Sequence, residues 1–83
     1  MEIEIRFYAG YKGEETPRAL VAGGIEYPIE RILSRRRCED KETGVRFDLF
    51  RCLVNGKKVL IRKDDSGKTE ILPSSDLSFL SPI

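Results

Sequence analysis

Hydrophobic and polar residues alternate along much of the chain. At its start, Ile3, Ile5 and Phe7 take every second position, with charged residues between them. Side chains of a β-strand point to opposite faces in turn, so this spacing predicts a half-buried strand over residues 1–8. The next segment, AGYKGEETP, contains two glycines and Pro17, and it is expected to be a loop.

Two glycines at positions 23 and 24 separate the segments RALVA and IEYPI. A two-residue Gly-Gly loop is typical of a β-hairpin, because glycine tolerates the positive φ of a primed turn. This hairpin places Leu20 opposite Tyr27 and Ala22 opposite Ile25. Cross-strand partners share a face of the sheet, so all four side chains are expected on one face.

Asn55-Gly56 is the strongest local signal in the chain, because both residue types suit a type I′ hairpin turn. The turn aligns Phe50 with Ile61, and Cys52 with Val59. These four side chains are then expected to form one apolar patch.

A second predicted hairpin indicates that the same face of the strand over residues 58–63 is buried. Asp65-Ser66-Gly67 fits a three-residue loop with Gly67 in the left-handed conformation, which sets Ile61 opposite Ile71 and Arg62 opposite Glu70. Both hairpins thus predict one set of buried residues: Phe50, Cys52, Val59, Ile61 and Ile71.

The alternation changes phase in two places. In VRFDLFRCLV (45–54) the apolar residues switch from odd to even positions after Leu49, and a similar change follows Ile29. Such changes mark β-bulges or strong bends, which small barrels use to turn corners. We therefore predict an all-β domain over residues 1–83: a small curled antiparallel sheet or an SH3-like, open barrel of about six strands.

The segment SSDLSFL near the end of the chain predicts a short helical turn with Ser74 or Ser75 as its N-cap. From that turn, Leu77, Phe79 or Leu80 would cover an open end of the barrel.

Composition excludes several chemistries. The chain has no histidine, and its two cysteines, Cys38 and Cys52, form no CxxC pair. Structural zinc sites use sets of Cys and His, and Ser- or Cys-based catalysis needs a histidine base. We therefore expect no enzyme, no metal and no cofactor, although carboxylates such as Glu14, Glu15 and Asp76 leave an acid–base enzyme as a third alternative. Cys52 is expected in the core, and the predicted register places the two sulfurs beyond disulfide reach.

No apolar run approaches the roughly 20 residues of a membrane-spanning helix. The first residues, MEIEIRFYAG, lack the basic and apolar regions of a signal peptide. The expected protein is cytoplasmic and does not bind membranes.

Charge is distributed unevenly. Residues 31–63 carry eleven basic and four acidic side chains, net +7, whereas residues 1–30 and 64–83 are each net −3. The segment SRRRCED (34–40) precedes a loop, KETG, that folds the chain back on itself. The hairpin sets Arg37 opposite Asp48 and Glu39 opposite Arg46, so these four residues are predicted to form structural ion pairs. With this pairing, the segment needs no outside ligand.

The remaining basic residues support a different hypothesis. Small β-barrels bind nucleic acid by combining a basic face with aromatic side chains that stack on bases. Tyr8, Tyr11 and Tyr27 are the possible stacking residues. A non-catalytic module would then contact nucleic acid or an acidic protein through residues 35–62. The candidates, expected on one face, are Arg35, Arg36, Arg51, Lys57, Lys58 and Arg62. The alternative is a protein–protein or self-associating module that uses an exposed strand edge, residues 2–8.

The chain contains the run GGIEYPIERILSRRR, followed by GVRFDLFRCLVNGKKVLI. Through these runs, residues 17–62 resemble a family of short, uncharacterised bacterial β-domains. The family pattern is Gly-x-x-Tyr-x-Ile/Val, then Ile/Val-Leu-x-x-x-Arg, then Asp-x-Phe-Arg before a glycine-containing hairpin. Similar modules occur alone and at the C-termini of proteins related to error-prone DNA polymerases, so the resemblance implies a β-fold and favours nucleic acid as partner. It implies no activity, and Arg36 stands near a position where the family often has an aromatic residue. The matching positions are Gly24, Tyr27, Ile29, Ile32, Leu33, Arg37, Asp48, Phe50 and Arg51.

Overall fold

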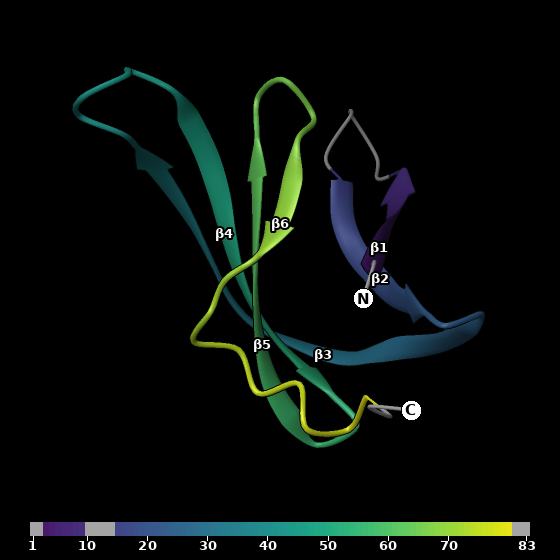
Figure 1. Cartoon of the computed structure of the whole chain (residues 1–83). Coiled ribbons are helices and arrows are strands. Elements are labelled where there is room, and N and C mark those ends of the chain that lie inside the picture. The colour runs from purple at the N-terminus through teal and green to yellow at the C-terminus, as the bar shows by residue number, and fades with distance from the viewer. Residues whose placement is uncertain (1–2, 10–14, 81–83) are drawn as a thin grey trace.

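A computed structural model describes residues 3–9 and 15–80 of the chain. They form one six-stranded antiparallel sheet in which the strand order follows the sequence (Figure 1). The sheet curls into a nearly closed barrel, which confirms the predicted all-β fold. The strands are β1 (Ile3–Ala9), β2 (Glu15–Ala22), β3 (Ile25–Glu39), β4 (Arg46–Val54), β5 (Lys57–Asp64) and β6 (Thr69–Ile71).

The predicted loop after residue 8 is shorter than expected, because β1 continues to Ala9 and β2 begins at Glu15. Pro17 lies inside β2, opposite Phe7. The pairing of β2 with β3 begins only at Ala19, so the missing N–H of Pro17 interrupts no ladder on that side. Glu2, Tyr11 and Glu14 lie outside the described residues.

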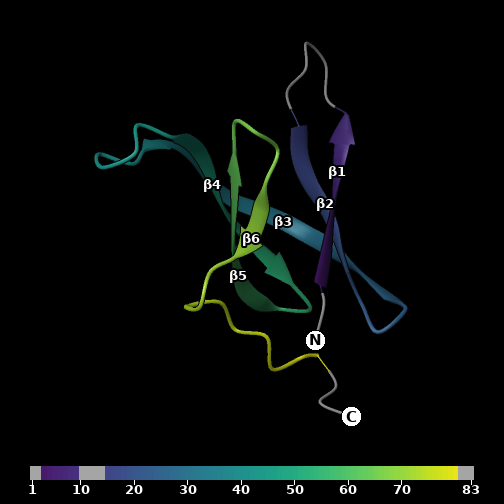
Figure 2. The same cartoon turned by 45° about the horizontal axis from the view of Figure 1, so that its top comes forward.

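β3 is a long bent strand that belongs to both halves of the barrel (Figures 1 and 2). It pairs with β2 over residues 25–28 and with β4 over residues 29–39. Its register against β4 shifts between Ile29 and Arg31, and again between Ile32 and Ser34. The predicted irregularity after Ile29 is confirmed, and the bulges bend the strand around the core.

The second predicted irregularity, after Leu49 in β4, is not a bulge against β5. Residues 47–54 pair with residues 57–64 in one continuous register. Instead, Phe47, Asp48 and Leu49 are all half-buried, so both faces of this part of β4 are partly covered. The apolar pattern changes because the burial changes along the strand.

Every predicted hairpin register is confirmed, including Leu20 with Tyr27, Phe50 with Ile61 and Ile61 with Ile71. The turns have the expected backbone conformations: Asn55 and Gly56 have φ values of 53° and 76°. Local turn chemistry therefore sets the alignment of the strands.

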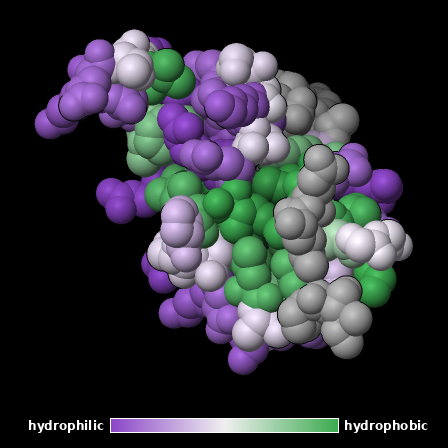
Figure 3. All heavy atoms as spheres, in the orientation of Figure 1, coloured by the Kyte–Doolittle hydropathy of each residue, from purple (hydrophilic) through white to green (hydrophobic). Residues whose placement is uncertain are grey.

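The core is centred on the β4–β5 hairpin and on Leu20 of β2. Phe50, Cys52, Val59 and Ile61 are fully buried as predicted, while Ile71 is half-buried and packs against them. Ile25 differs from expectation: although it lies opposite buried Ala22, its side chain is 53% exposed. In the space-filling view, hydrophobic residues gather at the centre of the face, below the hydrophilic hairpin tips (Figure 3).

The predicted C-terminal helical turn is not present in residues 72–80, which contain two tight turns and no helix. This segment instead follows the edge of β5. The backbone N–H of Asp76 donates to the carbonyl oxygen of Lys58, and the Ser75 hydroxyl accepts a hydrogen bond from the N–H of Leu60. Phe79 packs edge-to-face on Tyr27 with a centroid distance of 5.3 Å, so the tail covers the core as expected.

Candidate nucleic-acid interface

Strands β3, β4 and β5 present two chemically different faces. The inner face carries the buried side chains of Phe50, Cys52 and Val54. The outer face carries the residues that alternate with them. Three rows of cross-strand partners cross it: Arg31–Leu53–Lys58, Ser34–Arg51–Leu60 and Arg36–Leu49–Arg62.

Basic residues occupy the four corners and the centre of this three-by-three arrangement. We call these five residues the basic patch: Arg31, Arg36, Arg51, Lys58 and Arg62. Given the spacing of residues and strands in a sheet, their Cα atoms span about 13 Å along the strands and about 10 Å across them. Leucines and a serine take the positions between, which keeps the cations apart and limits their mutual repulsion.

Four of the five cations in the basic patch are available to a ligand. Arg31, Arg36, Arg51 and Lys58 are exposed, and within residues 3–9 and 15–80 they form no ion pair. Arg62 is held in place: its Nη1 lies 3.3 Å from Oε1 of Glu70, and its guanidinium lies 4.4 Å from the ring centroid of Phe47. The patch therefore combines one fixed and four free cations.

The six predicted binding residues do not all lie together. Arg36, Arg51, Lys58 and Arg62 share the outer face, as expected. The prediction of one common face is wrong for Arg35 and Lys57. Cross-strand partners share a face, and the partners of these two residues are the buried Phe50 and Val54. They therefore lie on the inner face of the sheet.

Arg31 completes the patch although it was not among the predicted residues. The bulge between Ile29 and Arg31 brings it opposite Leu53 and thus onto the outer face. The change in the apolar pattern after Ile29 indicates a bulge in this part of the sequence, but it does not show at which residue the bulge occurs.

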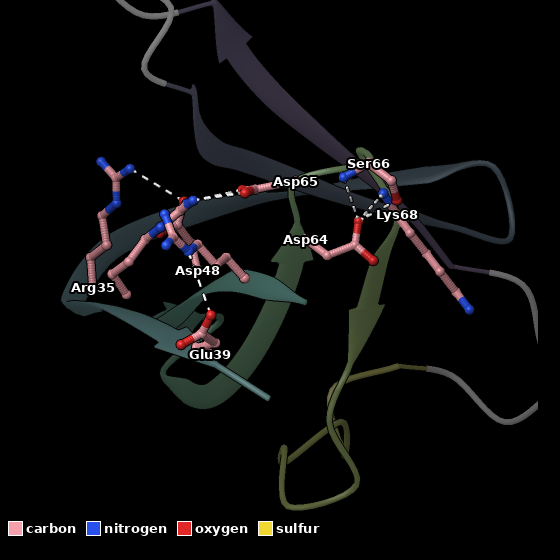
Figure 4. A network of polar contacts seen from close by, with 9 residues as sticks. Arg35, Glu39, Asp48, Asp64, Asp65, Ser66 and Lys68 are labelled. Atoms are coloured by element: carbon pink, nitrogen blue, oxygen red, sulfur yellow. Dashed lines mark hydrogen bonds and ion pairs between the residues drawn. The ribbon is translucent and has the colours of Figure 1, made fainter. Parts of the chain in front are cut away.

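Arg35 belongs instead to a polar network on the inner face (Figure 4). Its Nη2 lies 3.3 Å from Oδ2 of Asp48, and its guanidinium lies 5.6 Å from the ring centroid of Phe50. Asp48 also lies 3.4 Å from Nη1 of Arg37, so the predicted pair of Arg37 and Asp48 is confirmed. Asp48 is the central acceptor of the network, because both arginines lie close to its carboxylate. Its side chain is only 13% exposed.

Arg37 extends this network to the β5–β6 turn. Its Nη2 donates to both carboxylate oxygens of Asp65, at 2.7 and 2.9 Å. These hydrogen bonds raise the pKa of Arg37 above its usual value, and they join residues 28 positions apart. The predicted pair of Glu39 and Arg46 is also confirmed, at 3.7 Å and largely exposed. The network is structural, and it fixes the tips of two hairpins relative to each other.

Asp64, at the end of β5, stabilises the adjacent turn (Figure 4). Its Oδ1 accepts hydrogen bonds from the backbone N–H groups of Ser66 and Lys68, both at 3.0 Å, and from the Ser66 hydroxyl. The hydroxyl bond is the main reason why the pKa of Asp64 lies below its usual value. This carboxylate is thus engaged mainly in its own turn, although the nearby charge of Arg62 also contributes to its lowered pKa.

The predicted stacking residues are also engaged. Tyr27 packs on Phe79, and the guanidinium of Arg18 lies 5.4 Å from the ring centroid of Tyr8. Arg18 and Tyr8 line a groove of about 610 Å³ between β2 and β3, which Arg31 borders from the patch side. Tyr11 lies outside the described residues. Phe47 lies on the outer face of β4, next to the basic patch, and the guanidinium of Arg62 covers its ring.

Both cysteines are free thiols. Cys38 is half-buried opposite Phe47, whereas Cys52 is fully buried opposite Val59. Burial raises the pKa of Cys52 to about 11. Among the described residues no group of three His, Cys, Asp or Glu side chains is placed to hold a metal ion.

This burial predicts unequal reactivity of the two thiols. The thiolate is the reactive form, and at neutral pH Cys52 is both protonated and inaccessible. In the native protein a disulfide reagent should therefore modify one thiol per chain quickly, at Cys38, and the second only after denaturant is added. Two equally fast thiols in the native state would contradict the burial of Cys52.

Comparison with protein-family models, with curated proteins and with solved structures gives no match to this chain. Residues 3–9 and 15–80 include no helix that is long and apolar enough to cross a membrane.

Proposed function

We propose that this protein is a non-catalytic, cytoplasmic module that binds nucleic acid through the phosphate groups. The observation that supports this most directly is the basic patch, where four exposed cations that form no ion pair within residues 3–9 and 15–80 share one face with Arg62. Duplex DNA carries one negative charge per about 1.7 Å of its axis, so about 13 Å of duplex presents roughly eight phosphates. Such a stretch therefore offers enough phosphates for several of the five cations of the patch to make contacts at once.

The same face argues for recognition of phosphates and not of bases. Phe47 is covered by Arg62, and aliphatic side chains separate the cations. Contacts to phosphate position a protein on nucleic acid without reading its sequence. Binding should therefore depend little on sequence, and the resemblance to modules of polymerase-related proteins is consistent with this role.

The test is a salt titration of binding to duplex DNA and to single- and double-stranded RNA. Each phosphate contact contributes about −0.9 to the slope of log affinity against log salt for duplex DNA. Three or four contacts predict a slope of about −3 to −4 and roughly micromolar or weaker binding at physiological salt.

Two triple variants distinguish binding through the basic patch from an effect of the overall positive charge. The triple variant R36S/R51S/K58S removes three patch cations and should lower the low-salt affinity at least tenfold and flatten the slope by about 2–3. The control K41S/R46S/K68S removes three exposed cations away from the patch and should change both values far less. If no nucleic acid binds at low salt, or if both triple variants bind equally, the proposal fails. An acidic protein partner then becomes the first candidate.

A further inference from the structure

The strand β1 forms a long free edge of the sheet, because it pairs with β2 alone (Figure 2). The opposite edge, β6, is only three residues long, and its Glu70 is bound to Arg62. A groove of about 880 Å³ is lined by Ile3 and Ile5 of β1 and by Thr69 at the start of β6. An exposed edge of seven residues offers unpaired backbone donors and acceptors to another strand.

The side chains of β1 are self-complementary in an antiparallel pairing. If two copies pair with Ile5 at the two-fold axis, each Glu4 lies opposite the partner's Arg6 and each Arg6 lies opposite the partner's Glu4. Glu4 and Arg6 are exposed, and within the described part of the chain neither forms an ion pair. Opposite charges in directly facing positions stabilise a pair of strands.

The inner face of β1 is complementary in the same register. Ile5 would face the partner's Ile5, and Ile3 would face the partner's Phe7. All three residues are only half-buried in the single chain, where they pack against the edge of the core. Pairing would cover apolar surface that one copy leaves partly exposed.

Neighbouring registers lack this match. Moving the axis by one residue, to Glu4 or to Arg6, keeps the apolar faces continuous but places two like charges opposite each other at the axis. Like charges in facing positions destabilise a sheet. The arrangement Glu4-Ile5-Arg6 therefore selects one register.

We propose that two copies of this protein associate through antiparallel pairing of β1 with β1, centred on Ile5. A symmetric two-strand contact of this kind is isologous, so it closes after two copies and leaves no free edge at β1 for a third. The buried area is small, so the dimer is weak and depends on concentration.

Charge reversal in the full chain tests the register. Sedimentation of wild-type protein should show a dimer whose population rises with concentration. In Glu4→Arg and in Arg6→Glu, both ion pairs become like-charge pairs, so the dimer dissociation constant should rise by roughly tenfold or more. The double variant E4R/R6E should restore dimerisation. An equimolar mixture of the two single variants should also associate, because every facing pair in the mixed dimer has opposite charges.

Controls and a second measurement make the outcome decisive. Lys41→Glu and Glu42→Arg reverse charges of the same size at the exposed β3–β4 turn and should leave dimerisation unchanged. Amide hydrogen exchange in β1 should slow as the concentration of wild-type protein rises. A wild-type protein that stays monomeric up to about 1 mM overturns the proposal. So do single variants that dimerise as well as wild type, or a mixture that fails to associate.

Discussion

Replacing Phe50 with alanine is expected to lower the melting temperature of the protein by at least about 12 °C. The ring is fully buried at the centre of the core. Truncating a buried Phe costs about 3–5 kcal/mol of unfolding free energy. A domain of this length has roughly 4–12 kcal/mol in total, at about 0.05–0.15 kcal/mol per residue. One substitution thus removes a large share of the stability.

Urea or thermal denaturation followed by circular dichroism measures this effect. Each kcal/mol corresponds to about 4–8 °C in Tm for a domain of this size, so Phe50→Ala should melt at least about 12 °C below wild type. Ile25→Ala is the matched control, because its side chain is 53% exposed and its loss should cost less than about 0.5 kcal/mol. Equal effects of the two substitutions would show that the core lies elsewhere.

Asp48→Ala is expected to have the largest effect among the charged residues. Asp48 lies on the inner face between Arg37 and Lys63, and it also binds Arg35. Without its carboxylate, three cations remain close together around a largely buried position. Hydrogen bonds to charged groups contribute about 1.5–3 kcal/mol each, so a loss of about 2–3 kcal/mol in unfolding free energy is expected.

The exposed pair of Glu39 and Arg46 provides the control for Asp48. Both side chains are more than half exposed, and such a pair contributes between about 0 and 1 kcal/mol. Glu39→Ala should therefore shift Tm by a few degrees at most, while Asp48→Ala shifts it by about 8–24 °C. If the two shifts are similar, Asp48 is a surface carboxylate and the inner-face network contributes little.

The strand alignment was predictable because it depends on short-range chemistry. Asn55-Gly56 specifies its turn from two residues, and the register of Phe50 with Ile61 follows by counting. The face that carries Arg36 and Arg51 follows in the same way. Within a regular hairpin, residue type and position are enough to predict which residues pair and on which face each side chain lies.

The features that the sequence did not reveal arise between distant segments. The ion pair of Arg37 with Asp65 joins a strand to a turn of another hairpin, and no pattern in either segment indicates the other. Likewise, Ser75 and Asp76 bond to the backbone of β5, which outcompetes the helical turn that their local sequence favours. Arg31 reaches the outer face through a bulge whose position depends on how β3 wraps the core.

The strand order of the sheet has a consequence for how the protein folds. Each strand pairs with its neighbour in sequence, so every backbone ladder in the described residues closes across a single short connection. Contacts between residues close in sequence cost little loop entropy to form, and proteins rich in such contacts fold quickly for their class. The β4–β5 hairpin carries five of the six fully buried core residues, so we expect it to form early in folding. Strands β3 and β6 are then expected to add to its two sides, and the β1–β2 hairpin to join last.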